Sequence, residues 1–369
     1  MAKILLLFFS LALMSEDLIA QLKAQPQSSN PWSFGVNTYY GAIFQYRKGT
    51  SMLNFTDPYG IELYGSVQTT GKREWERMYK HPKIGFSASY YNYGVPDELG
   101  EAFSLTSYFD NNITKGRRNA LRLNLGTGFV YHTKYYKPET NELNSAIGSK
   151  ICFSLRGTLY YEIQLQEKLF LNLNLAFRHF SNGGLNKPNN GMNFPLIGLG
   201  VRYQPHAVQI AEHDEIQKSA IDKRIRYNLK LATGRKEVLL VDEKHPVYSI
   251  VFYASKKISR FSGIMIGADG RWDTSLRNEF ISDQLTPPEG TLDPKMAGIT
   301  IGHELFIGDV SFILQLGHYI YKPYDDIFPA VYQRYGLQYY VTKNLSVSGM
   351  LVAHTRTADH AEFGIGIHL

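Results

Sequence analysis

Apolar and polar side chains alternate along most of the chain from Pro31 onward, in segments of about ten residues that turn residues separate. Residues 119–133 show the pattern clearly, with one face carrying Leu121, Leu123, Leu125, Phe129 and Tyr131. The other face carries Arg122, Asn124, Gly126 and His132. Successive side chains of a β-strand point to opposite sides of the sheet, so each segment predicts a strand with one apolar and one polar face.

The same pattern predicts the order of the strands along the chain. Eight strands are expected near residues 34–46, 59–69, 83–93, 101–111, 119–133, 150–165, 168–182 and 193–204. The segment 205–225 is rich in charged residues and is expected to be a linker that could be helical, and about six to eight further strands should follow within 226–369. The chain is therefore expected to be all-β and antiparallel, with roughly 14 to 16 strands in one barrel or in two smaller ones.

Alternation alone does not decide between a secreted β-sandwich and a transmembrane β-barrel, because a sandwich also has one apolar and one polar strand face. The strands are long and numerous, and tyrosine pairs recur near their ends, which is typical of an aromatic belt at a membrane interface. These pairs are Tyr39 and Tyr40, Tyr90 and Tyr91, Tyr135 and Tyr136, Tyr160 and Tyr161, and Tyr339 and Tyr340. The pattern favours a transmembrane β-barrel.

The N-terminus and the composition support this interpretation. Lys3 precedes an apolar run, residues 4–14, that is too short for a transmembrane helix, so residues 1–24 are expected to be a cleaved signal peptide. The 369 residues are 44% hydrophobic, and a mean hydropathy of -0.25 excludes a bundle of membrane helices. Although the net charge is +6, the 39 Lys and Arg are scattered, which argues against nucleic-acid binding. The one cysteine, Cys152, excludes an intramolecular disulfide and a multi-cysteine zinc site.

The two halves of the chain share a weak internal similarity. Gly157, Tyr160 and Tyr161 recur loosely as Gly336, Tyr339 and Tyr340. The similarity indicates either a duplicated hairpin array or only the general likeness of barrel strands to one another.

The segment with the clearest chemical potential lies where the seventh expected strand ends. The alternation that puts Leu175 and Phe177 on the apolar side puts His179 and Ser181 there too, and Asn193 of the next strand shares that side. Polar groups facing lipid without partners are costly, so these three should hydrogen-bond one another or lie at headgroup level. Residues i and i+2 of one strand face lie about 7 Å apart, within reach for an imidazole to take a proton from a hydroxyl.

Around this pair the chain has a His-x-Ser-Asn motif followed by a Gly and a Pro-Asn-x-Gly loop, formed by His179, Ser181, Asn182, Gly184, Pro188, Asn189 and Gly191. In this motif the sequence resembles the lipid A 3-O-deacylase family of outer-membrane barrels. The resemblance implies an eight-stranded barrel within residues 25–204 that hydrolyses an acyl ester of lipid A or lipopolysaccharide in the outer leaflet of the bacterial outer membrane. It implies His179 as general base, Ser181 as nucleophile and Asn182, Gly184 or Asn189 as oxyanion donors, with no metal or organic cofactor. The residues after Tyr203 are not explained by it.

One position departs from the family pattern. The family has a glutamate where this chain has Asn193, which can orient an imidazole but cannot offset its positive charge. Glu362 could replace the missing acid, but the alternation around it places both Glu362 and His354 inside the barrel. Two hypotheses follow: an outer-membrane esterase with His179, Ser181 and Asn193 at its centre, or a non-catalytic barrel for transport or envelope structure that has lost the acid.

Overall fold

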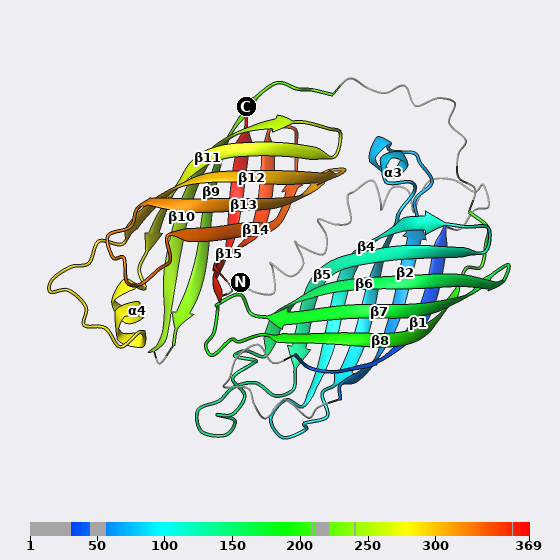
Figure 1. Cartoon of the computed structure of the whole chain (residues 1–369), viewed down its shortest axis with the longest axis horizontal. Coiled ribbons are helices and arrows are strands. Elements are labelled where there is room, and N and C mark those ends of the chain that lie inside the picture. Colours follow the sequence, from blue (N-terminus) through cyan, green and yellow to red (C-terminus); the bar gives the residue numbers. More distant parts are fainter. Residues whose placement is uncertain (1–30, 45–56, 209, 211–220, 240, 356) are drawn as a thin grey trace. The chain divides into compact units, whose positions relative to one another are not determined.

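The computed structural model describes residues 31–44, 57–208, 210, 221–239, 241–355 and 357–369, and its strands form two closed antiparallel barrels (Figure 1). The expected signal peptide and residues 211–220 of the expected linker lie outside these residues. The first barrel contains β1 Trp32–Gly41, β2 Tyr59–Gln68, β3 Lys83–Asn92, β4 Glu101–Lys115, β5 Asn119–His132, β6 Ile151–Gln166, β7 Leu169–Ser181 and β8 Met192–Tyr203. A short helix, α3 Glu74–Met78, lies between β2 and β3.

The second barrel is also built from eight strands. These are β9 Arg226–Val238, β10 Val241–Lys257, β11 Ser262–Asp273, β12 Lys295–Ile307, β13 Val310–Tyr321, β14 Val331–Tyr340, β15 Leu345–His354 and β16 Thr357–His368. The helix α4 Leu276–Ser282 follows β11. Neither α3 nor α4, nor any other helix of the described residues, is long and apolar enough to cross a membrane.

The predicted all-β fold is confirmed, and the choice between one barrel and two is settled by which strands pair at the seams. β1 pairs with β8, with Phe34 opposite Tyr203, which closes the first barrel. β16 pairs with β9, with His368 opposite Asn228, which closes the second. The alternation of side chains carries no information on which distant strands pair, so it could not distinguish one large barrel from two smaller ones. The described parts of the expected linker, 205–208, 210 and 221–225, contain no helix.

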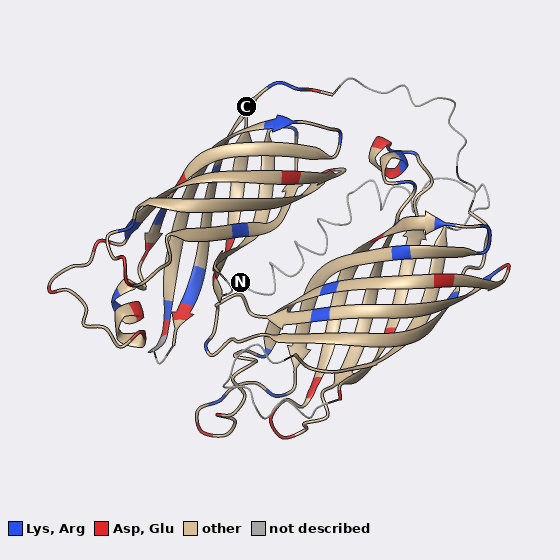
Figure 2. Cartoon of the chain, in the orientation of Figure 1, with Lys and Arg blue, Asp and Glu red and all other residues tan. Residues whose placement is uncertain are grey.

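The strands of both barrels turn their apolar faces outward. On β7, Leu175 is 61% exposed, whereas Arg178 is 2% exposed and points inward. In Figure 2 most of the strand surface carries no charge, and many of the Lys, Arg, Asp and Glu residues lie in turns and loops. The first tyrosine pair is split between the two faces: Tyr39 is 3% exposed inside the barrel and Tyr40 is 52% exposed outside. The predicted belt therefore receives only one tyrosine from this pair.

The interior of the first barrel is filled by a buried ionic cluster. Glu62 accepts hydrogen bonds from Arg156 Nη1 at 2.7 Å and from Asn37 Nδ2 at 2.9 Å. Arg178 of β7 approaches the same carboxylate at 3.7 Å and donates to the Tyr91 hydroxyl at 2.9 Å. Because Arg178 precedes His179 directly, this cluster fixes the inner face of β7 next to the predicted site.

The interior of the second barrel is also filled by buried charges. The Lys236 ammonium contacts Asp273 at 2.8 Å, Asp359 at 2.8 Å and Glu279 of α4 at 2.9 Å. Glu362 is 1% exposed and pairs with Arg334 at 2.8 Å, inside this second barrel. The alternation therefore placed Glu362 correctly as an interior residue, where it is held by an arginine.

The similar residues of the two halves lie on corresponding strands, but their side chains point to opposite faces of the sheet. Tyr160 of β6 points inward and is 7% exposed. The inward residues of β14, the sixth strand of the second barrel, include Tyr332, Arg334 and Gln338, so Tyr339 points outward. A duplicated hairpin would keep each tyrosine on its own face, so this motif reflects the general likeness of barrel strands.

Candidate functional site

His179 and Asn193 are directly opposite each other on paired strands. β7 and β8 run antiparallel with His179 in register with Asn193, and both side chains are half-buried on the outward face. His179 Nδ1 donates to Asn193 Oδ1 across a distance of 2.7 Å. An amide oxygen can only accept, so the proton of the neutral imidazole is held on Nδ1 and Nε2 carries the free lone pair.

Ser181 lies two residues further along β7 on the same face and is held by the following loop. Asn189 Nδ2 donates to Ser181 Oγ at 2.9 Å, while Asn189 Oδ1 accepts from the backbone N–H of Asn182 at 3.1 Å. One asparagine side chain thus joins the hydroxyl to the backbone of the next residue. This contact fixes the serine at the end of β7 and aims an amide donor at its oxygen.

Gly191 brings the loop close to both His179 and Ser181. Its φ is +72°, which favours glycine. A methyl group added to it would lie 3.2 Å from His179 Cε1 and 3.7 Å from Ser181 Cβ. The edge of the imidazole and the serine therefore flank the same point of the backbone, and a larger residue would press on the ring.

The β5–β6 loop supports this segment through backbone hydrogen bonds. Asn190 N donates to Ser145 O at 3.2 Å, and Gly191 N donates to Ala146 O at 3.0 Å. Sequence reasoning missed Ser145 and Ala146, because carbonyl groups in an irregular loop leave no mark in the side-chain pattern. The site is therefore assembled from two loops as well as two strands.

The electrostatic character of the site follows from these neighbours. Among the described residues, Asn193 is the hydrogen-bond partner of His179, and no carboxylate lies within ion-pair distance of the ring. The charged groups of β7 and its neighbours point into the barrel, on the other side of the sheet. The structure brings together His179, Asn193, Ser181, Asn182 and Asn189. Gly184 follows with a φ of +87°, and its part as an oxyanion donor stays a prediction.

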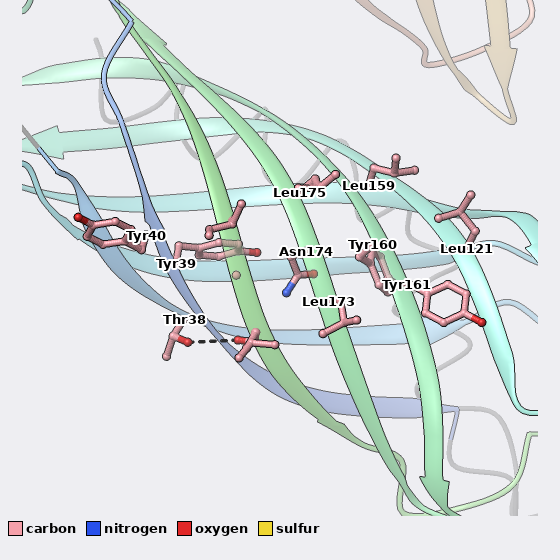
Figure 3. A pocket seen from close by; sticks show the side chains of 13 residues that line it. Thr38, Tyr39, Tyr40, Leu121, Leu159, Tyr160, Tyr161, Leu173, Asn174 and Leu175 are labelled. Carbon is pink, nitrogen blue, oxygen red and sulfur yellow. Dashed lines mark hydrogen bonds between the residues drawn. The ribbon is translucent and has the colours of Figure 1, made fainter. Parts of the chain in front are cut away.

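An open apolar groove of about 700 Å³ lies on the outside of the same barrel (Figure 3). Its outward-facing lining comes from β1, β5, β6, β7 and β8 and includes Tyr40, Leu121, Leu159, Leu173, Leu175 and Ile197. Leu175 and Ile197 lie directly opposite each other in the strand register. The groove thus lies on the strands that carry His179, Ser181 and Asn193, further from the loops.

Two family models match the chain. The model of the lipid A 3-O-deacylase (PagL) matches residues 59–203, and that of the acyloxyacyl hydrolase C-terminal domain matches residues 225–369. The two matches fall on the two barrels. No curated protein sequence matches the chain.

Several solved structures align with the chain at low identity and low TM-score. Neisserial surface protein A is 6% identical over 47% of this chain and 97% of its own, with a TM-score of 0.35. The outer membrane enzyme PagL is 18% identical over 45% of this chain and 97% of its own, with a TM-score of 0.33. A triple mutant of the Rhodopseudomonas blastica porin is 9% identical over 92% of this chain and 100% of its own, with a TM-score of 0.20. The first barrel is thus similar to the lipid A 3-O-deacylase (PagL) family and the second to the acyloxyacyl hydrolase C-terminal domain, and the chain is a bacterial outer-membrane β-barrel protein.

Proposed function

We propose that the first barrel is an esterase that removes an acyl chain from lipid A or a related glycolipid. The observation that carries this proposal is the outward His179–Asn193 hydrogen bond of 2.7 Å, next to an outward Ser181. An outward site meets lipid directly, without passage through the barrel. At this end the loops 133–150 and 182–191 connect the strands, whereas the other end has the short turns 116–118 and 167–168 and one longer connection, 69–82, which contains α3. Bacterial barrels have their longer loops outside the cell, so the substrate is a lipid of the outer leaflet.

The reaction would proceed through an acyl-enzyme. His179 Nε2 takes the proton of the Ser181 hydroxyl as Oγ attacks the ester carbonyl, and the resulting imidazolium returns the proton to the departing sugar oxygen. Water then attacks the acyl-serine with His179 again acting as base, which releases the fatty acid and restores Ser181. Asn193 Oδ1 keeps the required tautomer through both steps.

The loop after β7 supplies the donors for the negatively charged oxygen. Asn189 Nδ2 already lies 2.9 Å from Ser181 Oγ, so a small movement would bring it to the developing oxyanion. The same movement would break the 3.1 Å hydrogen bond from the Asn182 N–H to Asn189 Oδ1, so that this N–H could also donate to the oxyanion. We assign Asn189, Asn182 and the Gly184 amide to this role, because donors aimed at the transition-state charge contribute several kcal/mol.

The apolar groove offers a place for the hydrocarbon chain. Leu175 lies six residues before Ser181 on the same strand face, about 20 Å along β7. Phe177, which is 43% exposed, lies between them and continues the apolar surface. A long acyl chain attached at Ser181 could therefore run along β7 into the groove, whereas a short chain would not reach it.

The second candidate function is that of a non-catalytic barrel, which the amide at position 193 favours. An asparagine leaves the imidazolium formed during the reaction without a counter-charge. Transport is the weaker form of this alternative. The ionic cluster around Glu62 fills the first barrel, and buried charged groups such as Lys236, at 1% side-chain exposure, fill the second.

The decisive experiment compares the purified full chain with Ser181→Ala. Each protein is incubated with hexa-acylated lipid A in detergent micelles, and lost acyl chains are identified by mass spectrometry. Ser107→Ala is the matched control, because Ser107 also faces outward from a strand of this barrel and, within the described part of the chain, its hydroxyl donates to the backbone carbonyl of Thr127. We expect deacylation by the wild type and by the control and none by Ser181→Ala. Unchanged lipid A with the wild type, or equal activity of Ser181→Ala, would refute the proposal.

A further inference from the structure

Asn144 is a buried polar residue in the β5–β6 loop whose side chain joins two loops of the first barrel. It is 2% exposed. Its Nδ2 donates to the carbonyl of Glu98, in the β3–β4 loop, at 2.8 Å, and its Oδ1 accepts from the backbone N–H of Ile147 at 3.0 Å. A buried amide with both ends satisfied is costly to replace and holds its surroundings in one geometry.

The turn that Asn144 closes contains the two carbonyl groups that support the candidate site. Ser145 and Ala146 lie between Asn144 and Ile147, and they accept hydrogen bonds from Asn190 N at 3.2 Å and Gly191 N at 3.0 Å. Ala146 and Ile147 are almost fully buried, so neighbouring side chains hold the turn on several sides. The hydrogen bond between Asn144 and Ile147 therefore spans the two residues whose carbonyls support the site, and Tyr136 N, which donates to Ile147 O at 2.7 Å, holds the end of the same turn.

The supported segment touches both reacting side chains. Asn189 donates to Ser181 Oγ, and Gly191 lies against the imidazole of His179. A displacement of the turn after Asn144 would therefore move the hydroxyl and the ring relative to each other. Reacting groups must be held closely, and a shift of about 1 Å caused by a distant mutation can lower the rate about 100-fold.

We propose that Asn144 is a positioning residue that sets the geometry of Ser181 and His179 through Ser145, Ala146 and the segment 189–191. It touches no substrate. Its effect passes through backbone hydrogen bonds from one loop to the next, and the inference rests on the proposed esterase function. The chemistry at Ser181 depends on it, whereas binding of the acyl chain along β7 does not.

The test replaces Asn144 by alanine and uses Asn141→Ala as the matched control. Asn141 lies in the same loop, and its Nδ2 donates to the same Glu98 carbonyl at 2.9 Å. Its second hydrogen bond goes to Tyr135 O, so its side chain does not hold the turn at Ile147. We expect Asn144→Ala to lower kcat for lipid A deacylation about 100-fold with KM little changed. Its Ser181 should react more slowly with a fluorophosphonate by a similar factor. Asn141→Ala should stay within about threefold of the wild type in both measurements.

Folding is checked separately through the melting temperature and the faster gel migration of the unheated barrel. The proposal requires Asn144→Ala to be slow in a sample that is folded to the same extent as Asn141→Ala. Equal kcat and equal labelling rates for the two variants would overturn it, as would a change confined to KM. If wild type and Ser181→Ala have the same activity, the proposed function fails instead, so the two failures are distinct.

Discussion

Replacing Asn193 by aspartate should accelerate the proposed reaction. Aspartate has the same size as asparagine, so the 2.7 Å hydrogen bond to His179 Nδ1 can be kept while a negative charge is added. That charge acts on the imidazolium, which exists in the transition state but not in the resting enzyme. Only an interaction that strengthens in the transition state raises kcat, so the change should appear in kcat more than in KM.

The size of the effect follows from the geometry of the site. Two opposite charges about 4 Å apart attract by about 4 kcal/mol at an effective dielectric constant of about 20, as for a partly exposed pair. Transfer of a carboxylate to the lipid-facing surface offsets part of this gain. In a serine protease, replacing the Asp of the triad by Asn lowers kcat about 10⁴-fold, partly because the histidine then takes the wrong tautomer. Asn193 Oδ1 keeps the correct tautomer here, so the gain in kcat from Asn193→Asp should be smaller than about 10⁴-fold. We expect a 10- to 100-fold increase in kcat, about 1.4 to 2.7 kcal/mol.

The assay follows acyl release from lipid A by mass spectrometry, with kcat and KM measured for wild type, Asn193→Asp and Asn193→Leu. Leucine has a similar volume and no acceptor, so it should free the imidazole to change tautomer and lower kcat at least 100-fold. An aspartate variant that folds and is no faster than the wild type would refute the role given to the missing charge. A leucine variant as active as the wild type would refute the role given to the hydrogen bond.

Three further predictions concern other parts of the first barrel. Gly191→Ala should lower kcat at least tenfold in the lipid A assay, because its φ is +72° and its methyl group would press on the imidazole; unchanged kcat would contradict this. Gly157→Phe should fold normally, since a methyl group there meets only Leu125, at 3.7 Å, among the described residues. Because Gly157 lies opposite Phe177, the new ring should slow deacylation of long-chain lipid A but spare a short-chain ester, and equal slowing of both would exclude the path along β7. Glu62→Ala should cost about 3 to 5 kcal/mol of unfolding free energy in denaturant titrations, since it leaves two buried arginines without their carboxylate; a loss below 1 kcal/mol would show that water replaces it.

The outward placement of His179 and Ser181 could be predicted because it depends on a local rule. His179 and Ser181 follow Leu175 and Phe177 at intervals of two residues, and a strand keeps this interval on one face until it ends. The same rule on β8 brought Asn193 to the outward side, and the register then placed it opposite His179. Strand periodicity thus predicted which strand face carries His179, Ser181 and Asn193 without knowledge of the fold.

The supporting contacts could not be predicted in this way. The bond between Asn189 and Ser181 and the carbonyls of Ser145 and Ala146 depend on loop conformations, which follow no period. The short helices α3 and α4 were missed as well, because five and seven residues are too few to establish a helical pattern. Nothing in the sequence distinguishes Asn144 from Asn141, and only the structure shows that their hydrogen-bond partners differ.

The even number of strands in each barrel has a consequence for biosynthesis. Every described strand pairs only within its own set of eight, so each barrel starts and finishes on the same side of the bilayer. Neither set of strands therefore needs the other to complete its strand pairing. Two separately translated polypeptides, divided between residues 204 and 225, should each be competent for insertion, which would allow the genes for the two halves to be exchanged or recombined independently.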